Sequence, residues 1–585
     1  MRASKMDGWI KNVAVPIENP FQPGVAIPGA RHGKRSPETE EYAARLTLSW
    51  EPSPDFDAEA KLMYHDHEGN GRTGYGETFC IGSTTIPTQS GIPIPNADCR
   101  KDRVKAESSI PSQFAGKWPE VDVKDGVLYD EGEFFIASLR LNKRFGALEL
   151  ASTSGYYDQN EAGSYNADYG AFAQALVPSK HDYRQFTQEI RLTSEFEGPF
   201  NFMVGGFFED GKRYWVNAPD LFHTYDPVFD TYADAASTSD TDTRSISFFG
   251  AVNYQLTPTI ELSGGLRYSK DKKSAVLVNK YVNPNSIAIG GLRAQGDALF
   301  PVYKDDNLSP EVTVSWKPSR DHLLFAAYKT GYKAGGISND ALLSPAATVD
   351  TVKFGNEEVE GFEVGYKGTL ADGTLQFDVT GYYYDYKGLQ VASYDVDALR
   401  SRIFNAAKVR TTGVTATATF QPTDRLSFNG NLGYNDAEYV SFENAACYSG
   451  QTEAEGCIGG FQDNSGKAPN RAPKWNLSFG GNYLIDLGGG WNSRISVSTS
   501  YSSSYQTNTD FAPGGVQDGY WLLNASVRVA SDEDKGLELA LIGRNLTNSY
   551  YMIYNFQQPF TGNPEQYYGV FNRPREVALQ ASFRF

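Results

Sequence analysis

The cysteines are the first residues of this chain whose type and spacing could do chemistry. Only four occur, and they form two local pairs, Cys80 with Cys99 and Cys447 with Cys457. Local pairs in otherwise irregular segments are typical of loop disulfides in an oxidising compartment. Zinc binding is the alternative, but the spacings are not those of a zinc knuckle. We therefore predict two loop disulfides, each of which would stabilise its loop by about 3 kcal/mol.

Two histidines, His65 and His67, lie two residues apart and would share one face of a strand. Imidazole is a common metal ligand, but with six histidines in 585 residues an incidental pair is the preferred interpretation. The sequence contains no nucleophile elbow, phosphate-binding loop or Cys/His zinc array. We therefore expect no enzyme activity and no bound cofactor.

The chain is strongly acidic, with a formal net charge of −18 at pH 7. Phosphate binding requires basic patches, so a nucleic-acid partner is not expected. Acidic residues collect in expected loops such as 225–242, which is poor in Lys and Arg. Such a loop could attract divalent cations, but a solvated surface is the preferred interpretation.

Extended strands must position these residues, because apolar residues alternate with polar ones at a period of two. The pattern is clearest at the carboxyl end, where the intervening Gln580, Ser582 and Arg584 would face a wet interior. The apolar stripe at this end consists of Val577, Leu579, Ala581, Phe583 and the terminal Phe585. The same alternation recurs upstream, for example over 311–316 and 375–380.

Short turns alternate with much longer connections along the chain. This asymmetry is expected when one rim of a membrane barrel faces the periplasm and the other faces outside. The long connections include 69–131, 216–242, 276–304 and 441–470. The nine short turns are EPSPD (51–55), NKRFG (142–146), EFEGP (195–199), LTPT (256–259), KPSRD (317–321), LADG (370–373), QPTD (421–424), DLGGG (486–490) and ASDEDKG (530–536).

These features together predict an all-β fold, a transmembrane antiparallel β-barrel, as one domain over residues 1–585. The apolar runs are shorter than the roughly 18 to 20 residues of a membrane helix, and the mean hydropathy is −0.46. Nine turns, with strands at about 39–50 and 1–13, give about 20 strands, whereas plugged transporters have 22. A soluble β-sandwich is the alternative that composition alone leaves open. Aromatic residues beside the short turns favour an interfacial girdle, and they are Trp50, Phe145, Tyr254, Trp316, Phe420 and Trp491.

Seven segments, in order, resemble those of TonB-dependent outer-membrane receptors. They are 248–273, 308–338, 362–391, 405–414, 471–475, 543–551 and 573–585. The residues that carry the resemblance are Gly265, Arg267, Tyr268, Gly331, Tyr332, Lys333, Gly413, Arg544, Asn545 and Leu546. We interpret most of them as scaffold, with glycines at close backbone approaches and Asn545 satisfying backbone groups at a strand exit.

The resemblance implies a location in the outer membrane of a Gram-negative bacterium and energy-coupled uptake of a small molecule. Ferric siderophores are the first substrate class, with vitamin B12, haem, saccharides and plant-derived aromatics as minorities. Haem is disfavoured, because 331–338 reads GYKAGGIS and lacks the motifs of haem receptors. Tyrosines expected in loops, Tyr156, Tyr157, Tyr165 and Tyr169, could stack on a planar ligand. Implied partners are outer-membrane lipid and the barrel-assembly machinery, which would read the terminal Phe585 stripe.

The chain departs from the family at its amino end. Nothing corresponds to the plug domain or to the short box that engages TonB, and residues 1–15 do not resemble a signal peptide. We therefore expect the carboxyl-terminal barrel of a longer receptor, which would engage the TonB complex only through the missing plug and box. A passive outer-membrane porin and a surface adhesion barrel are the alternatives.

Overall fold

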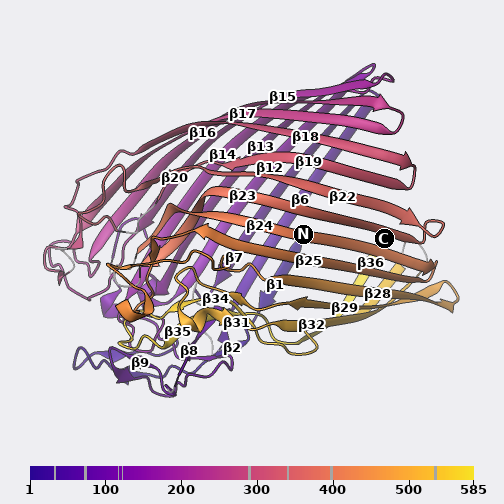
Figure 1. The fold of residues 1–585 in the computed structure, drawn as a ribbon. Helices are drawn as coiled ribbons and strands as arrows, with labels where there is room; N and C mark the ends of the chain where they lie inside the picture. Colours follow the sequence, from indigo (N-terminus) through magenta and orange to yellow (C-terminus); the bar gives the residue numbers. More distant parts are fainter. Residues whose placement is uncertain are drawn as a thin grey trace.

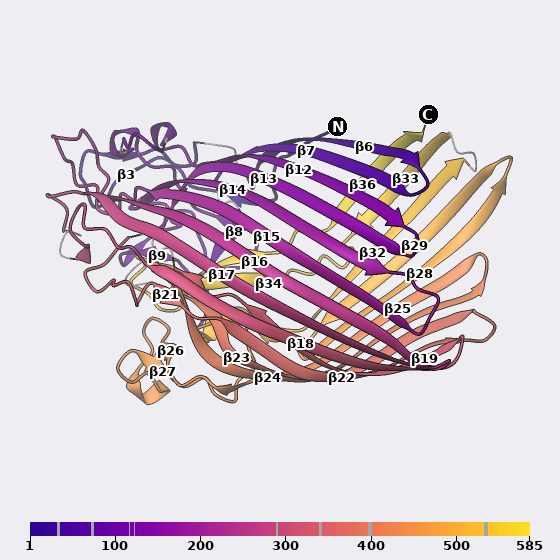
Figure 2. The ribbon, with the colours of Figure 1, turned by 90° about the horizontal axis from the view of Figure 1, so that it is seen from above.

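The computed structural model describes residues 1–31, 35–71, 75–82, 84–115, 117–121, 123–287, 291–338, 342–395, 400–531 and 536–584. Its main element is a sheet of 20 strands, as predicted, which curls into a barrel (Figures 1 and 2). Antiparallel pairing follows chain order from β1 through β6, β7 and β12 to β36. The strands are β1 (Arg2–Met6), β6 (Thr39–Ser53), β7 (Phe56–Gly69), β12 (Tyr129–Phe145), β13 (Leu148–Asn166), β14 (Leu176–Ser194), β15 (Phe200–Asn217), β16 (Ala235–Thr257), β17 (Ile260–Val282), β18 (Val302–Ser319), β19 (His322–Lys333), β22 (Glu357–Leu370), β23 (Leu375–Asp395), β24 (Arg400–Thr423), β25 (Leu426–Ser441), β28 (Trp475–Gly488), β29 (Trp491–Ser502), β32 (Tyr520–Ser531), β33 (Gly536–Arg544) and β36 (Glu576–Arg584).

The predicted short turns lie at one end of the barrel, where each joins two neighbouring strands (Figure 2). The ninth turn joins β32 to β33, and its residues 532–535 lie outside the described residues. The short-turn pattern therefore predicted the connectivity of the sheet.

Two predicted loops are shorter than expected. Strands β16 and β17 are each 23 residues long, so the connections are 218–234 and 283–301 rather than 216–242 and 276–304. The reason is physical: beyond the membrane both faces of a strand contact water, so the apolar face that identifies a membrane strand disappears.

The long connections fold into short elements at the other end of the barrel, which we call the outer cap. Its largest core contains Ile27, Ile110, Phe114, Phe172 and Leu176. A three-stranded sheet in the cap pairs β8 with β35 and β35 with β34. The small strands are β2 (Ile10–Asn12), β3 (Ile17–Glu18), β4 (Ala26–Ile27), β5 (Arg35–Ser36), β8 (Gly76–Cys80), β9 (Thr88–Gln89), β10 (Ile92–Pro93), β11 (Val104–Lys105), β20 (Gly336–Ile337), β21 (Lys353–Phe354), β26 (Ala445–Ala446), β27 (Phe461–Gln462), β30 (Tyr505–Gln506), β31 (Val516–Gln517), β34 (Met552–Gln557) and β35 (Gln566–Phe571). Short 3-10 helices cover Ser112–Phe114, Lys124–Gly126, Glu453–Glu455 and Pro513–Gly515.

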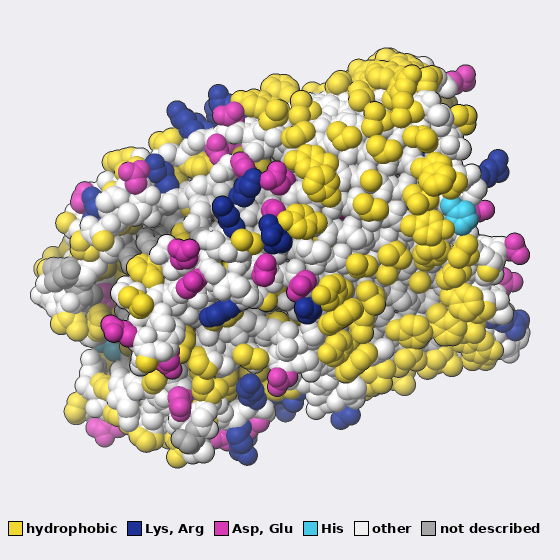
Figure 3. Space-filling view, in the orientation of Figure 1, with side chains coloured by type: hydrophobic (Ala, Val, Ile, Leu, Met, Phe, Trp, Pro, Cys, Tyr) yellow, Lys and Arg dark blue, Asp and Glu magenta, His cyan; other side chains and the backbone are white. Residues whose placement is uncertain are grey.

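Beside the short turns, an apolar belt covers the outside of the barrel (Figure 3). On β18 the outward positions from Trp316 through Val312 to Leu308 are exposed and mostly hydrophobic. The aromatic residues predicted for the girdle, Trp50, Phe145, Tyr254, Trp316, Phe420 and Trp491, are all exposed. No described helix is long and apolar enough to cross a membrane. The belt is the surface expected of a barrel in a bilayer.

Residues beside the two ends of the sheet are in contact at the outer rim. Trp9 follows β1 and Arg573 precedes β36, and the guanidinium carbon of Arg573 lies 5.2 Å from the centroid of the Trp9 ring. Both termini lie on the same side of the molecule in the two views (Figures 1 and 2). This cation–π contact joins the segments that flank the first and last strands.

Candidate functional site

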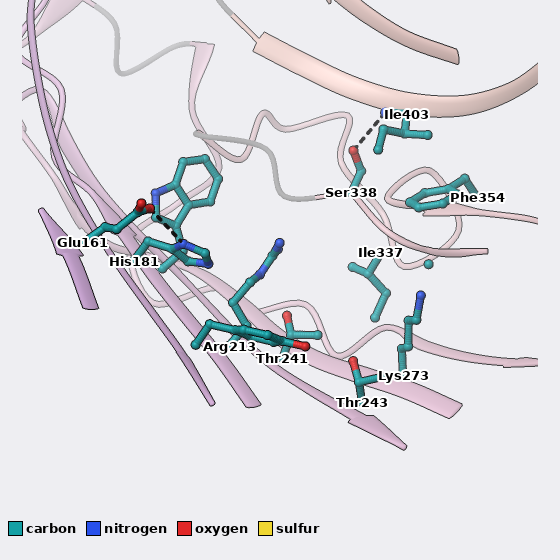
Figure 4. Close-up of a pocket in the computed structure, with 13 residues that line it drawn as sticks. Glu161, His181, Arg213, Thr241, Thr243, Lys273, Ile337, Ser338, Phe354 and Ile403 are labelled. Carbon is teal, nitrogen blue, oxygen red and sulfur yellow. Dashed lines mark hydrogen bonds and ion pairs between the residues drawn. The ribbon is translucent and has the colours of Figure 1, made fainter. Parts of the chain in front are cut away.

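A cavity of about 580 Å³ lies on the inner wall of the barrel, toward the outer cap (Figure 4). Its wall consists of alternate residues of adjacent strands, because successive side chains of a strand point to opposite faces. The opposite side is formed by β20, β21 and nearby residues. The lining residues are Glu161, His181, Tyr183, Arg213, Trp215, Thr241, Thr243, Lys273, Gly336, Ile337, Ser338, Phe354 and Ile403.

The cavity combines cationic and aromatic side chains. Arg213 and Lys273 rise from the wall toward the segment that carries Ile337 and Ser338 (Figure 4). The Nε atom of Arg213 and the Nε2 atom of His181 are buried and have no hydrogen-bond partner among the described residues. Buried polar atoms normally have partners, so these two nitrogens mark a part of the cavity wall whose hydrogen bonds are incomplete. The arrangement can hold an anionic ligand with planar groups.

The connection between β19 and β22 is fastened to this wall. The Lys273 ammonium donates a hydrogen bond to the Gly335 carbonyl at 2.8 Å, and the Gly335 N–H donates to the Tyr303 hydroxyl at 2.9 Å. A Cβ on Gly335 would lie 2.3 Å from the carbonyl oxygen of Phe354, so only glycine fits. The side of the cavity opposite the wall is therefore positioned by backbone contacts.

The family-signature residues before this connection lie at the end of β19. The Tyr332 hydroxyl donates a hydrogen bond to the Asp271 carboxylate on the inner wall of β17. A Cβ on Gly331 would lie 3.1 Å from a Val359 methyl group, and Lys333 is the last residue of the strand. Tyr332 therefore contributes to placing the segment that completes the cavity.

The mid-barrel signature residues occupy β17. Tyr268 faces outward in the apolar belt, whereas Arg267 faces inward and donates a hydrogen bond to Ser247 at 3.0 Å. The Arg267 guanidinium also lies 5.3 Å from the ring centroid of Phe249. At Gly265 a Cβ would meet the flexible Glu311 side chain, whose Oε1 atom would lie at 2.7 Å. None of these residues lines the cavity.

The remaining signature residues serve backbone geometry in the structure. A Cβ on Gly413 would lie 2.3 Å from the carbonyl oxygen of Tyr434, so the strand has no room for a side chain there. The Asn545 amide donates to the carbonyl groups of Ser549 and Arg573 at 2.9 and 3.1 Å. Leu546 continues this turn, and the exposed Arg544 lies 3.8 Å from the Glu576 carboxylate. That these signature residues act as scaffold, and so stabilise the folded protein, stays a prediction.

The terminal stripe lies on the outside of β36. Its members are exposed, with Leu579 at 79% and Phe583 at 68%, and they pair with the apolar positions of β33. Phe585 lies outside the described residues. Recognition of this stripe by the assembly machinery stays a prediction. The described members are Val577, Leu579, Ala581 and Phe583.

The structure joins Cys80 to Cys99 and Cys447 to Cys457, both in outer connections. Their oxidation in the cell stays a prediction. The His65 and His67 rings stack with centroids 5.9 Å apart, and His67 Nε2 lies 3.5 Å from the Asp130 carboxylate. Within the described ranges, no group of three or more His, Cys, Asp or Glu residues could hold a metal ion.

Three of the tyrosines expected in loops lie in β13, namely Tyr156, Tyr157 and Tyr165, and only Tyr169 lies in a connection. Tyr169 packs against Tyr568 with ring centroids 4.5 Å apart. None of the cavity-lining residues was predicted from the sequence. The available signal was the pair Arg213 and Trp215, which alternate on one face of a strand whose polar side faces the lumen.

Comparison with known proteins gives consistent results. The family described as "TonB dependent receptor-like, beta-barrel" matches residues 101–546. The pesticin receptor of Yersinia pestis is 25% identical over 260 residues, which cover 44% of this chain. The match spans 35% of that curated relative, about a third of its length.

Solved structures share the fold. The ferric yersiniabactin uptake receptor FyuA from Yersinia pestis superimposes with a TM-score of 0.68 at 14% identity, covering 99% of this chain and 73% of FyuA. The siderophore receptor PiuA from Acinetobacter baumannii gives a TM-score of 0.65 at 15% identity, covering 95% of this chain and 76% of PiuA.

Proposed function

Because the chain belongs to the TonB-dependent receptor β-barrel family, we propose that it takes up a ferric siderophore, or a similarly scarce nutrient, across the outer membrane. The family consists of receptors and transporters of the Gram-negative outer membrane, so the chain is an outer-membrane protein and not an enzyme. Uptake would be energised through TonB, and the folded barrel would contact lipid and the assembly machinery.

One observation carries the substrate class. The lumenal cavity presents Arg213 and Lys273 together with the aromatic rings of Tyr183, Trp215 and Phe354. Ferric chelates are commonly anionic, and their iron-binding groups are often planar. Cations and rings together match both properties. FyuA and PiuA, which share the fold, are a ferric yersiniabactin uptake receptor and a siderophore receptor, and this likeness supports the same class.

Quenching of tryptophan fluorescence tests the proposal, because Trp215 lines the cavity. The purified chain would be titrated with catecholate, hydroxamate and carboxylate ferric chelates. We expect one class to bind, and Arg213→Gln to weaken its binding by roughly tenfold or more, as expected for loss of a charged hydrogen bond. Arg184→Gln is the matched control, because Arg184 faces outward on β14 and pairs with Asp158 at 3.2 Å.

Other outcomes would contradict the proposal. If no chelate binds and the chain forms large open pores in a planar bilayer, it is a passive porin. Attachment of cells to surfaces without any ligand, together with normal growth under iron limitation, would identify an adhesion barrel. If Arg213→Gln and the wild-type chain bind the chelate equally well, the cavity is not the binding site.

A further inference from the structure

Four cations form a cluster on the outside of the barrel. Arg244 on β16 lies directly opposite Lys272 on β17, which lies directly opposite Lys304 on β18. Lys270 lies two residues before Lys272 on the same face. We call these four residues the cation cluster. Like charges directly opposite each other destabilise a sheet, so the cluster needs a compensating partner.

The cation cluster lies immediately above the apolar belt. Tyr268 lies on the same face as Lys270, two residues closer to the short turn. It pairs with Phe248 on β16 and Leu308 on β18, and all three side chains are exposed. From Ile260, beside the short turn, to Lys272 the strand rises about 30 Å along the barrel axis. An apolar band is about 25 Å tall, which places the cluster at the level of the outer lipid head groups.

The carboxylates nearby leave much of this charge unpaired. Arg244 pairs with Asp210 at 3.1 Å, and Asp306 lies across from Lys270. Over the described chain, Lys270, Lys272 and Lys304 form no ion pair within 4.0 Å. The next carboxylate on this face, Asp242, lies 3.8 Å from Lys212, so the four cations of the cluster have Asp210 and Asp306 as their directly opposed carboxylates.

The neighbouring part of the wall, from β22 to β25, differs. At the same side of the belt, Lys387 pairs with Glu360 at 2.6 Å and Lys474 pairs with Asp436 at 3.0 Å. Arg410 pairs with Asp385 at 2.9 Å. At these three positions the cations are paired, in contrast to Lys270, Lys272 and Lys304.

We propose that the cation cluster binds the phosphate groups of a phosphorylated lipid in the outer leaflet. The phosphates would lie between Lys272 and Lys304, where negative charge relieves the repulsion of the opposed ammonium groups. The acyl chains would lie on Phe248, Tyr268 and Leu308, which continue into the belt. This continuity of a charged row with a lipid-facing surface selects a lipid over a soluble anion.

Native mass spectrometry of the full chain in neutral detergent tests the proposal. The ligands are diphosphorylated lipid A and the same lipid with its phosphates removed. The test variant combines Lys270→Gln, Lys272→Gln and Lys304→Gln, and the matched control, which removes the same number of charges, combines Lys387→Gln, Arg410→Gln and Lys474→Gln. We expect the test variant to bind diphosphorylated lipid at least about tenfold more weakly, and the control to bind it like the wild-type chain. The dephosphorylated lipid should bind the wild-type chain as weakly as the diphosphorylated lipid binds the test variant.

Folding of the test variant is checked by thermal unfolding in the same detergent without added lipid. Because the substitutions remove like-charge repulsion, the variant should be at least as stable as the wild-type chain. Binding within twofold of wild type, or equal loss in the control, would overturn the proposal. So would displacement of the lipid by millimolar inorganic phosphate, which would indicate a soluble anion. The test does not involve the lumenal cavity, so it is independent of the transported substrate.

Discussion

At the scale of single residues, the outer cap contains a fully buried carboxyl group, that of Glu77. Glu77 on β8 accepts a hydrogen bond from the Tyr550 hydroxyl at 2.7 Å. Burial raises the pKa of Glu77 to about 7, although the Tyr550 hydrogen bond acts in the opposite direction. The Arg103 guanidinium lies 4.2 Å from the centroid of the Tyr550 ring. The charge inside the cap therefore changes near neutral pH.

Glu77→Gln should alter how the stability of the cap depends on pH. The folded pKa lies above the ordinary value of 4.5, so the Glu77 contribution is fully present below pH 4.5 and lost as pH rises through about 7. Above pH 7, Glu77→Gln should stabilise β8 by about 2 to 3 kcal/mol relative to wild type. Hydrogen exchange of the β8 amides at pH 5 and pH 8 measures this difference.

Tyr550→Phe is the control for that prediction. Removing the hydroxyl donor should raise the Glu77 pKa further and deepen the loss of protection at pH 8. Identical pH profiles for wild type and Glu77→Gln would contradict the assignment of the pH dependence to this carboxyl group.

At the scale of elements, the strands and short turns could be predicted from local sequence. The way in which the long connections pack against the barrel could not. The Pro, Asp and Gly turns located eight hairpins and the ends of the ninth, because each turn depends on a few adjacent residues. The cavity depends on partners far apart, such as Lys273 and Gly335. The outer ends of β16 and β17 were not predicted, because above the belt both faces of these strands contact water and the apolar alternation is lost.

The pair Cys80→Ser and Cys99→Ser should loosen the cap at β8. The disulfide closes a separation of 19 residues, and its loss should cost about 3 kcal/mol in the chain-entropy account. Hydrogen exchange in β8 and β35 should therefore increase, whereas Cys447→Ser with Cys457→Ser should act mainly on β26 and β27. Thiol counting by mass spectrometry without reductant accompanies the experiment. Four free thiols in the wild-type chain would refute both disulfides.

At the scale of the whole molecule, the belt and the lumen are separated by single-residue alternation. Val312 faces outward, 47% exposed, midway between Trp316 and Leu308, whereas the next residue, Thr313, faces the lumen. The barrel wall, one strand thick, therefore has an apolar face toward lipid and a polar face toward the water-filled lumen.

Arginine at adjacent positions should measure that separation. Val312→Arg would place a charge near the bilayer midplane and should lower the free energy of unfolding by roughly 2 to 4 kcal/mol. Thr313→Arg is the matched control and should cost far less, because its charge would contact water in the lumen. Urea unfolding in phospholipid vesicles, followed by tryptophan fluorescence, gives both values. Similar costs at the two sites would mean that the belt does not face lipid.

The pairing of β8 with β35 has a consequence for biogenesis. Cys80 lies opposite Gln566, so two segments separated by most of the polypeptide form one small sheet. Such a distant pairing cannot form until the ribosome has nearly finished translating the chain, and it closes slowly because the intervening segment is long. The three-stranded sheet of the outer cap can therefore form only in a chain that extends through β35. A product terminated before residue 566 would lack the strand that pairs with β8.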